Sequence, residues 1–177
     1  MKYGILGGTF DPVHCGHVEM ACEGLRVGLK QVIVMPCRLS PHKNQTPLSD
    51  AIESMEHRWA MLQIAFQNIE GVTLSRFELE GPTPSYTWRT LMHLENERPG
   101  DHLVLMLGLD QLLVLDQWAN YSDWSRRISY LVFNREVGSP SDIPEKFKKL
   151  NIQFIERKIS PASSTIVRQK IRGGGES

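Results

Sequence analysis

A short stretch near the start of the chain combines residue types that bind phosphate. Residues 7–17 read GGTFDPVHCGH, with Gly7 and Gly8 directly after a short apolar run and with His14 and His17 three residues apart. Glycine has no Cβ, so the backbone can come close to an anion. A helix that begins within the stretch points free N–H groups and the positive end of its dipole at the same place. The two imidazoles, on one face of that helix, can reach the anion as well.

The same stretch also allows a structural interpretation. The glycines can make a tight turn and the two histidines can cap the helix or face solvent, which is the more common role of an isolated pair. Zinc would need a third ligand, and Cys15, Cys22 and Cys37 do not show a zinc-binding spacing. The spacing is also neither that of a Walker loop nor that of a dinucleotide-binding fingerprint. We therefore expect no metal ligand from the protein.

A carboxylate follows the most apolar segment of the chain. Residues 103–107 read LVLML, and Gly108 and Asp110 come directly after them. If this segment is a buried strand, Asp110 lies at its carboxyl end, where it can accept hydrogen bonds from ribose hydroxyls. The alternative, equally strong for the residue in isolation, is that Asp110 caps the next helix.

Three hydroxyl residues precede the last predicted helix. Ser163, Ser164 and Thr165 are good N-cap residues, and the helix N-terminus that they cap can also bind phosphate. Arg168, one turn later, can reach phosphate oxygens with its planar guanidinium. Taken alone, the hydroxyl residues indicate capping; together with the histidine stretch they favour phosphate binding.

Short apolar runs alternate with longer segments of helical periodicity along the chain. This alternation predicts an α/β fold in which helices cover both faces of a parallel sheet. The expected strands are residues 3–6, 31–35, 72–76, 103–107, 129–133 and 152–155, and the expected helices are 16–29, 52–68, 85–97, 110–118 and 163–171. We expect a single domain over residues 1–177 with a flexible tail at 172–177. In such sheets ligands bind at the carboxyl ends of strands, where the strand order reverses.

Composition excludes several other classes of function. The 20 Lys and Arg residues balance 20 Asp and Glu residues, which argues against a nucleic-acid-binding protein because the duplex selects a basic face. Three cysteines without a paired spacing argue against a secreted disulfide framework. No apolar run approaches the roughly 20 residues of a membrane span. We expect a cytoplasmic protein without nucleic-acid or membrane partners; a homo-oligomer remains open.

Further motifs occur in a fixed order along the chain. They are Ser40-Pro41-His42-Lys43, His57-Arg58-Trp59-Ala60-Met61-Leu62, Pro84-Ser85-Tyr86-Thr87 with Thr90-Leu91, Gly108-Leu109-Asp110, Trp118, and Ser163-Ser164-Thr165-Ile166-Val167-Arg168. Together with residues 7–17, this series resembles the nucleotidyltransferase superfamily with the H-x-G-H motif, and most closely its nicotinate-nucleotide adenylyltransferases. The resemblance covers residues 7–168, nearly the whole chain.

This resemblance implies a Rossmann-like fold, a reaction and roles for individual residues. The implied reaction transfers the adenylyl group of ATP to nicotinate mononucleotide, giving deamido-NAD⁺ and pyrophosphate in NAD biosynthesis, with Mg²⁺ carried by the ATP phosphates. The implied catalytic residues are His14, His17, Lys43 and Arg168. The implied ATP-binding residues are Gly7, Gly8, Thr9, Phe10, His17, Gly108, Asp110, Ser163, Ser164, Thr165 and Arg168. The implied acceptor-binding residues are Lys43, Thr87 and Trp118, whose indole can stack on a pyridinium ring through a cation–π attraction of about 1 kcal/mol.

Alternatives remain at this point. The same chemistry could act on nicotinamide mononucleotide or phosphopantetheine, or the pocket could belong to a non-catalytic nucleotide-binding regulatory protein. Arg89 departs from the pattern, because an acidic residue is expected there in the resembling family. As a cation it could favour a carboxylated ring, or it could face solvent.

Overall fold

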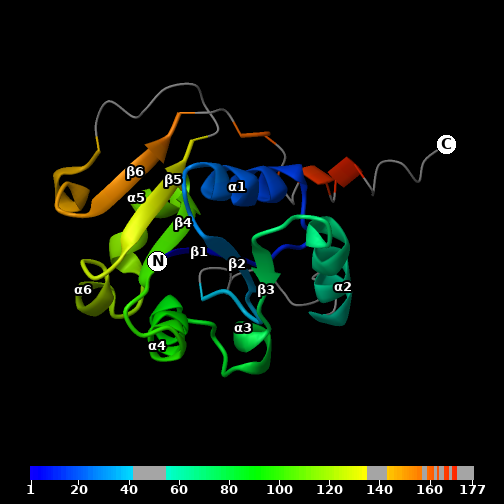
Figure 1. Ribbon diagram of the computed structural model, residues 1–177, viewed down its shortest axis with the longest axis horizontal. Coiled ribbons are helices and arrows are strands. Elements are labelled where there is room, and N and C mark those ends of the chain that lie inside the picture. The colour runs from blue at the N-terminus through cyan, green and yellow to red at the C-terminus, as the bar shows by residue number, and fades with distance from the viewer. Residues whose placement is uncertain are drawn as a thin grey trace.

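Each of the six apolar segments forms a strand of one parallel sheet (Figure 1). The computed structural model describes residues 1–41, 55–134, 143–156, 159–161, 163, 166–167 and 169–170. The strands are β1 (Lys2–Gly8), β2 (Gln31–Pro36), β3 (Val72–Leu74), β4 (His102–Gly108), β5 (Ser129–Phe133) and β6 (Asn151–Ile155). The helices are α1 (Cys15–Arg26), α2 (Met55–Phe66), α3 (Phe77–Glu80), α4 (Thr87–Glu97), α5 (Leu109–Leu113) and α6 (Tyr121–Trp124), with short 3₁₀ helices η1 (Leu115–Gln117) and η2 (Glu145–Phe147).

The strand order places β1 between β2 and β4. The order is β3-β2-β1-β4-β5-β6, and every neighbouring pair is parallel. The chain therefore builds outward from β1 to β3 on one side, then returns across the sheet to start β4 on the other side. The strand order reverses between β1 and β4, which is where sheets of this class bind ligands.

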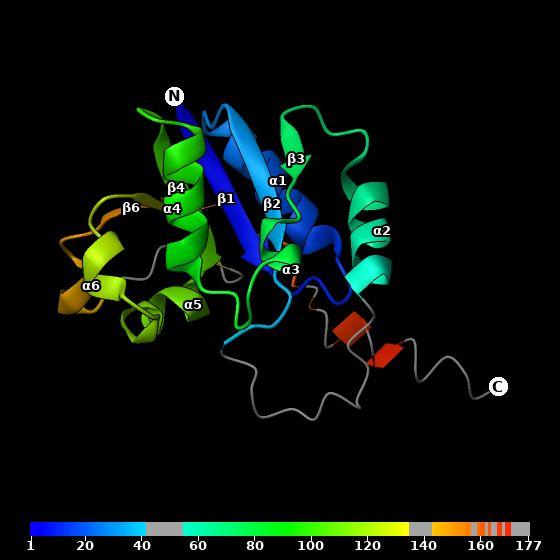
Figure 2. The ribbon, with the colours of Figure 1, turned by 90° about the horizontal axis from the view of Figure 1, so that it is seen from below.

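Helices cover both faces of the sheet because successive strand residues point to opposite sides (Figure 2). On one face, Ile33, Met35 and the odd-numbered residues of β4 pack with Leu91 and Leu94 of α4 and Trp124 of α6. On the other face, Val32, Val34 and Met106 pack with Ala21 of α1 and with Leu62 and Phe66 of α2. Burial on both faces explains why these strands are continuously apolar rather than alternating.

The predicted fold class and all six predicted strands are confirmed, with differences at their ends. The predicted helix at 110–118 is instead α5 followed by the 3₁₀ turn η1. Leu112 of α5 and Leu115 of η1 are both buried in the same core cluster. The short helices α3 and α6 were not predicted, since four residues are too few to show a helical period. Within the described ranges, no helix is long and apolar enough to cross a membrane.

Two glycines let α1 pack closely against the centre of the sheet. A Cβ added to Gly4 of β1 would lie 2.6 Å from both Leu29 Cδ1 and Met106 Sδ. A Cβ added to Gly24 of α1 would lie 2.8 Å from Met106 Cε. Since Met106 is buried, the added methyl group has little room, and overpacking of this kind strains a core.

The Gly4→Ala substitution is expected to lower the free energy of unfolding by about 1–3 kcal/mol. Urea unfolding at equilibrium measures this change. The control is Cys22→Ala on α1, an exposed position where the change should stay within about 0.5 kcal/mol. Equal stability of Gly4→Ala and the parent protein would show that Leu29 and Met106 pack more loosely around Gly4 than these distances indicate.

Candidate active site

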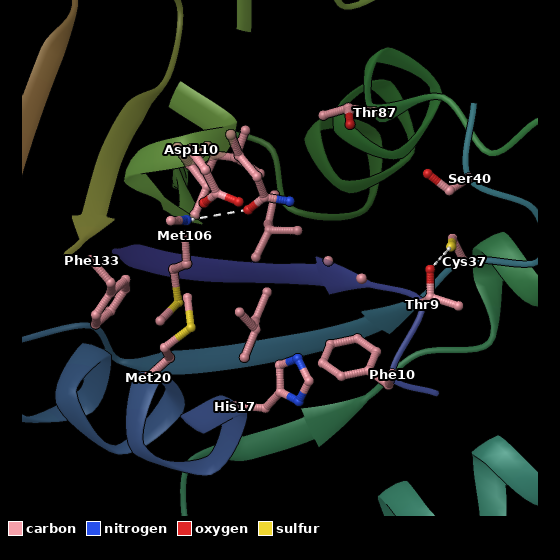
Figure 3. Close-up of a pocket in the computed structure, with 18 of the residues that line it drawn as sticks. Thr9, Phe10, His17, Met20, Cys37, Ser40, Thr87, Met106, Asp110 and Phe133 are labelled. Atoms are coloured by element: carbon pink, nitrogen blue, oxygen red, sulfur yellow. Dashed lines mark hydrogen bonds between the residues drawn. The ribbon is translucent and has the colours of Figure 1, made fainter. Parts of the chain in front are cut away.

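A cavity of about 690 Å³ opens at the carboxyl ends of β1 and β4, where the strand order reverses (Figure 3). Its volume lies in the range of small-molecule sites. Most of the predicted site residues line it, namely Gly7, Gly8, Thr9, Phe10, His14, His17, Thr87, Gly108, Asp110 and Trp118. Four predicted site residues, Lys43, Ser164, Thr165 and Arg168, lie outside the described residues.

His14 and His17 form a reciprocal cap at the start of α1. His14 is the N-cap residue, and its Nδ1 accepts a hydrogen bond from the Gly16 N–H at 3.1 Å. The His17 Nδ1 in turn accepts from the His14 N–H at 3.1 Å. The two rings stack with their centroids 3.7 Å apart. The expectation that the two histidines cap the helix is therefore confirmed for their Nδ1 atoms.

The contacts at Nδ1 also fix the position of the proton on each neutral ring. A neutral imidazole that accepts at Nδ1 has its proton on Nε2, so both Nε2 atoms are donors in this arrangement. The Gly16 N–H is used inside the cap, so the helix N-terminus acts on a ligand through the imidazoles as well as through its dipole. The expectation that backbone N–H groups of this helix contact phosphate directly stays a prediction.

Phe10 and Gly16 keep the histidine rings in place. Phe10 is 2% exposed, and its ring lies edge-on to His17 at a centroid distance of 4.7 Å (Figure 3). Its φ of 51° is unusual for a residue other than glycine, and burial of the ring offsets that local strain. A Cβ on Gly16 would lie 3.0 Å from the His14 ring and 3.3 Å from the Ser160 carbonyl oxygen. The glycine in H-x-G-H is thus needed for close approach.

Arg58 of α2 anchors the two segments that follow β1 and β2. Its side chain is 1% exposed, and Nη1 donates to the carbonyl oxygens of Thr9 and Cys37, both at 2.8 Å. A charged donor fixes a carbonyl more firmly than a neutral one. Arg58 does not line the cavity, so it acts by holding the backbone on which Thr9 is placed. In the sequence this arginine is a motif residue without an assigned role. In the structure it is buried and holds the backbone after β1 and β2.

Gly108 and Asp110 form a compact turn at the end of β4. A Cβ on Gly108 would lie 2.6 Å from Asp110 Oδ1, so glycine leaves the space that this carboxylate occupies. The Gly108 N–H donates to Gln111 Oε1 at 3.2 Å. Asp110 is exposed at the cavity wall, where its carboxylate could accept hydrogen bonds from the hydroxyls of a ligand.

A second group of polar residues lines the side of the cavity next to α4. Ser85, Thr87 and Thr90 belong to this side, together with Glu78 of α3. Trp118 is half-buried there, with its ring centroid 6.4 Å from that of Trp124. Sequence reasoning missed Glu78, because nothing in the sequence indicates that a residue of this four-residue helix is half-buried on the cavity wall.

Arg89 does not line the cavity. Its Nη1 donates to the Pro84 carbonyl oxygen at 3.1 Å, and its guanidinium lies over the rings of Tyr86 and Trp88 at 5.1 and 5.2 Å. The cation that departs from the family pattern therefore braces the segment before α4. The structure favours neither of the two roles expected for it, a ring-carboxylate contact or a purely solvent-facing side chain.

The chain returns to α1 after β6. Ile159 and Ser160 line the cavity, and the Ser160 N–H donates to Glu19 Oε2 of α1 at 2.6 Å. Ser163, which is not among the lining residues, accepts a hydrogen bond from the Ile166 N–H at 3.2 Å through its side chain. That contact is a helix cap, and residues 166–167 and 169–170 are helical.

The described wall of the cavity carries few charged side chains. Among the described residues, no group of three or more His, Cys, Asp or Glu side chains could hold a metal. The charged and titratable side chains on the described wall are His14, His17, Cys37, Glu78 and Asp110. Mg²⁺ is commonly held by substrate phosphates with several water molecules, which requires no dedicated set of carboxylates.

Burial raises the pKa of the Glu78 carboxyl above its ordinary value, against a hydrogen bond from the Thr90 hydroxyl that lowers it. The folded protein therefore binds this proton more tightly than the unfolded chain. Stability is lost as the pH rises through the folded pKa, because the charged carboxylate is disfavoured where it is buried.

We expect the stability of Glu78→Gln, relative to the parent protein, to rise between about pH 5 and about pH 8, since glutamine cannot ionise. Urea unfolding at both pH values measures the difference. The matched control is Glu70→Gln, which removes an exposed carboxyl. If the free energy of unfolding differs between Glu78→Gln and the parent protein by the same amount at both pH values, burial does not raise the pKa of Glu78.

The comparisons with known proteins agree with this geometry. A family model described as cytidylyltransferase-like matches residues 5–170. "Probable nicotinate-nucleotide adenylyltransferase" of Clostridium kluyveri is 31% identical over an alignment that covers 98% of this chain and 89% of that protein. The protein of the same name from Clostridium novyi is 34% identical, with 97% and 87% covered.

Solved structures show the same fold. Nicotinic acid mononucleotide adenylyltransferase of Plasmodium falciparum, solved in complex with APC and in complex with NaAD, superposes with a TM-score of 0.74 in both cases. The identity is 20%, and the match covers 95% of this chain and 82% of those chains. With a family model that spans residues 5–170 and relatives that align over nearly the full length, this chain belongs to the cytidylyltransferase-like family.

Proposed function

We propose that this chain transfers the adenylyl group of ATP to nicotinate mononucleotide, forming deamido-NAD⁺ and releasing pyrophosphate in NAD biosynthesis. Its relatives at 31% and 34% identity carry the name of this activity over nearly the whole chain. The cavity at the reversal of strand order contains the two sides that the reaction needs, a histidine-capped helix for phosphates and an α4 side for the acceptor.

One observation favours the nicotinate ring over the nicotinamide ring. Helix α4 begins at Thr87, and among the described residues no side chain caps its N-terminus at Tyr86. An uncapped helix start offers N–H groups and a positive dipole end to an anion. The ring carboxylate of nicotinate is such an anion, whereas the nicotinamide amide is neutral. Thr87 adds a hydroxyl donor, and Trp118 offers a face for the pyridinium ring.

The triphosphate side needs more positive charge than the described wall supplies. The described lining residues include no lysine or arginine, only His14 and His17. Lys43 and Arg168 supply the missing cations in this proposal, and Ser163, Ser164 and Thr165 begin the helix that carries Arg168. Gly7, Gly8, Thr9 and Phe10 form the turn beneath the phosphates, and Asp110 accepts the ribose hydroxyls of ATP.

The chemistry follows from position and charge. A phosphate oxygen of the mononucleotide attacks the α-phosphorus of ATP, and the bond between this phosphorus and the oxygen bridging to the β-phosphorus breaks. Pyrophosphate leaves with the electron pair of that bond. Negative charge grows on the oxygens around the α-phosphorus, where the Nε2–H of His17 donates, while Mg²⁺ enters as part of Mg·ATP. No covalent enzyme intermediate is required, because the two substrates are held in line.

The test is pyrophosphate release from Mg·ATP with nicotinate mononucleotide and nicotinamide mononucleotide in parallel assays. We expect a kcat/KM at least ~10-fold higher for the nicotinate acceptor, as the helix dipole at α4 distinguishes an anion from a neutral group. Equal or opposite preference would overturn the assignment of the α4 N-terminus to the ring carboxylate. Turnover with neither mononucleotide would overturn the proposed activity.

His17→Ala is expected to lower kcat by about 100- to 1,000-fold, since it removes a donor from the charge that develops in the transition state. Steady-state kinetics with both substrates saturating measures this. The matched control is His57→Ala, an exposed histidine of α2 outside the cavity, which should keep kcat within about twofold. Near-normal turnover of a folded His17→Ala variant would remove His17 from the transition-state contacts.

A further inference from the structure

Ser85 lies where three parts of the acceptor side meet. It comes two residues before Thr87, the first residue of α4, and its side chain is 8% exposed at the cavity wall. The segment after β2 and helix α3 both contact it. A buried hydroxyl at such a junction needs partners, and this one has them on both neighbouring segments.

The contact with the segment after β2 uses the side chain and backbone of Ser85. The Arg38 N–H donates to Ser85 Oγ at 3.1 Å. The Ser85 N–H donates to the Leu39 carbonyl oxygen at 2.9 Å. Two opposed hydrogen bonds between neighbouring residues fix both the distance and the register of two chain segments. Ser40 and Pro41, which follow directly, therefore line the cavity at a set position relative to α4.

The contact with α3 completes the junction. Ser85 Oγ donates to the Glu78 carbonyl oxygen at 3.5 Å, a long hydrogen bond. The Glu78 carboxylate accepts from the hydroxyl of Thr90, one turn into α4. Glu78 therefore links α3, to which it belongs, with Thr90 of α4. Ser85 links Glu78 with the segment after β2. Figure 3 shows Ser40 and Thr87 on the same side of the cavity.

We propose that Ser85 is a positioning residue for the acceptor: its hydroxyl holds the start of α4 in register with residues 38–41, so that the α4 N-terminus faces the bound mononucleotide. This inference rests on the proposed function. The hydroxyl touches neither substrate in this role and acts through Thr87 and the backbone at the helix start. Without it, the Arg38 N–H loses its acceptor and the two segments can shift apart.

The proposal predicts an effect on one substrate. Ser85→Ala should raise KM for nicotinate mononucleotide about 10-fold, because a displaced α4 binds the acceptor less well before and during the reaction. KM for ATP and kcat should stay within about twofold, since the histidine-capped helix is on the other side of the cavity. If Ser85 had a purely structural role, Ser85→Ala would lower the melting temperature without a selective rise in the acceptor KM.

The matched control is Ser75→Ala. The Ser75 hydroxyl also accepts a backbone N–H at the start of a helix, from Phe77 at 3.3 Å, but Ser75 does not line the cavity. Both KM values should be unchanged in this variant. The conservative rescue is Ser85→Thr, which keeps the hydroxyl that accepts the Arg38 N–H, whereas Ser85→Ala removes it. Ser85→Ala, but not Ser85→Thr, should raise KM for the acceptor. If Ser85→Ala does not fold, Ser85→Cys decides the proposal, because its thiol is similar in size but is a weak acceptor.

The experiment is steady-state kinetics of the full chain, with KM determined for each substrate at saturating levels of the other, and thermal melting in parallel. A selective rise in the acceptor KM supports the proposal. Unchanged KM values, or equal rises in both, overturn it while leaving the proposed function intact if the parent protein uses nicotinate mononucleotide. A parent protein that uses only nicotinamide mononucleotide is tested on that acceptor with the same criteria. Turnover with neither overturns the proposed function, and the inference with it.

Discussion

The position of β1 between β2 and β4 is the constraint on which the site depends. Because the chain leaves β1 toward β2 and later returns to β4 on the other side, the segments after these strands diverge and leave a cavity between them. Three glycines line this opening, namely Gly7, Gly8 and Gly108. The apolar core on both faces of the sheet keeps the strands rigid beneath them.

Hydrogen bonds within the protein hold several groups in place at or behind the cavity wall. His14 and His17 accept backbone N–H groups at Nδ1 at the start of α1, which places the proton of each neutral ring on Nε2. The buried guanidinium of Arg58 acts through the backbone, by holding the carbonyls of Thr9 and Cys37. Such groups are in place before substrate arrives and need little rearrangement during reaction, which is the main advantage of a preorganised site.

Much of the fold and part of the site could be predicted from sequence, for physical reasons. Strands buried on both faces are continuously apolar, so their positions were evident, and residues soon after them were natural candidates, as Asp110 was. His17 was found from its spacing to His14 and from the family motif. Glu78, Ser85 and Arg58 could not be found in this way. Their importance comes from burial and from partners 7 to 49 residues away in sequence, which periodicity does not reveal. The interruption of the predicted helix at 110–118 also depends on packing, not on local preference.

The contact between α1 and the return segment has a consequence for the order in which the molecule is assembled. Glu19 and Ser160, 141 residues apart, are joined by a hydrogen bond, and Gly16 lies against the same segment. Bringing such distant residues together costs chain entropy that only the preceding contacts can offset. The nucleotide pocket is thus closed by a part of the chain that leaves the ribosome late, and a nascent chain that ends at β5 can form the central strands without a complete pocket wall. Nucleotide binding would therefore report on the final stage of folding, while the signal from secondary structure develops earlier.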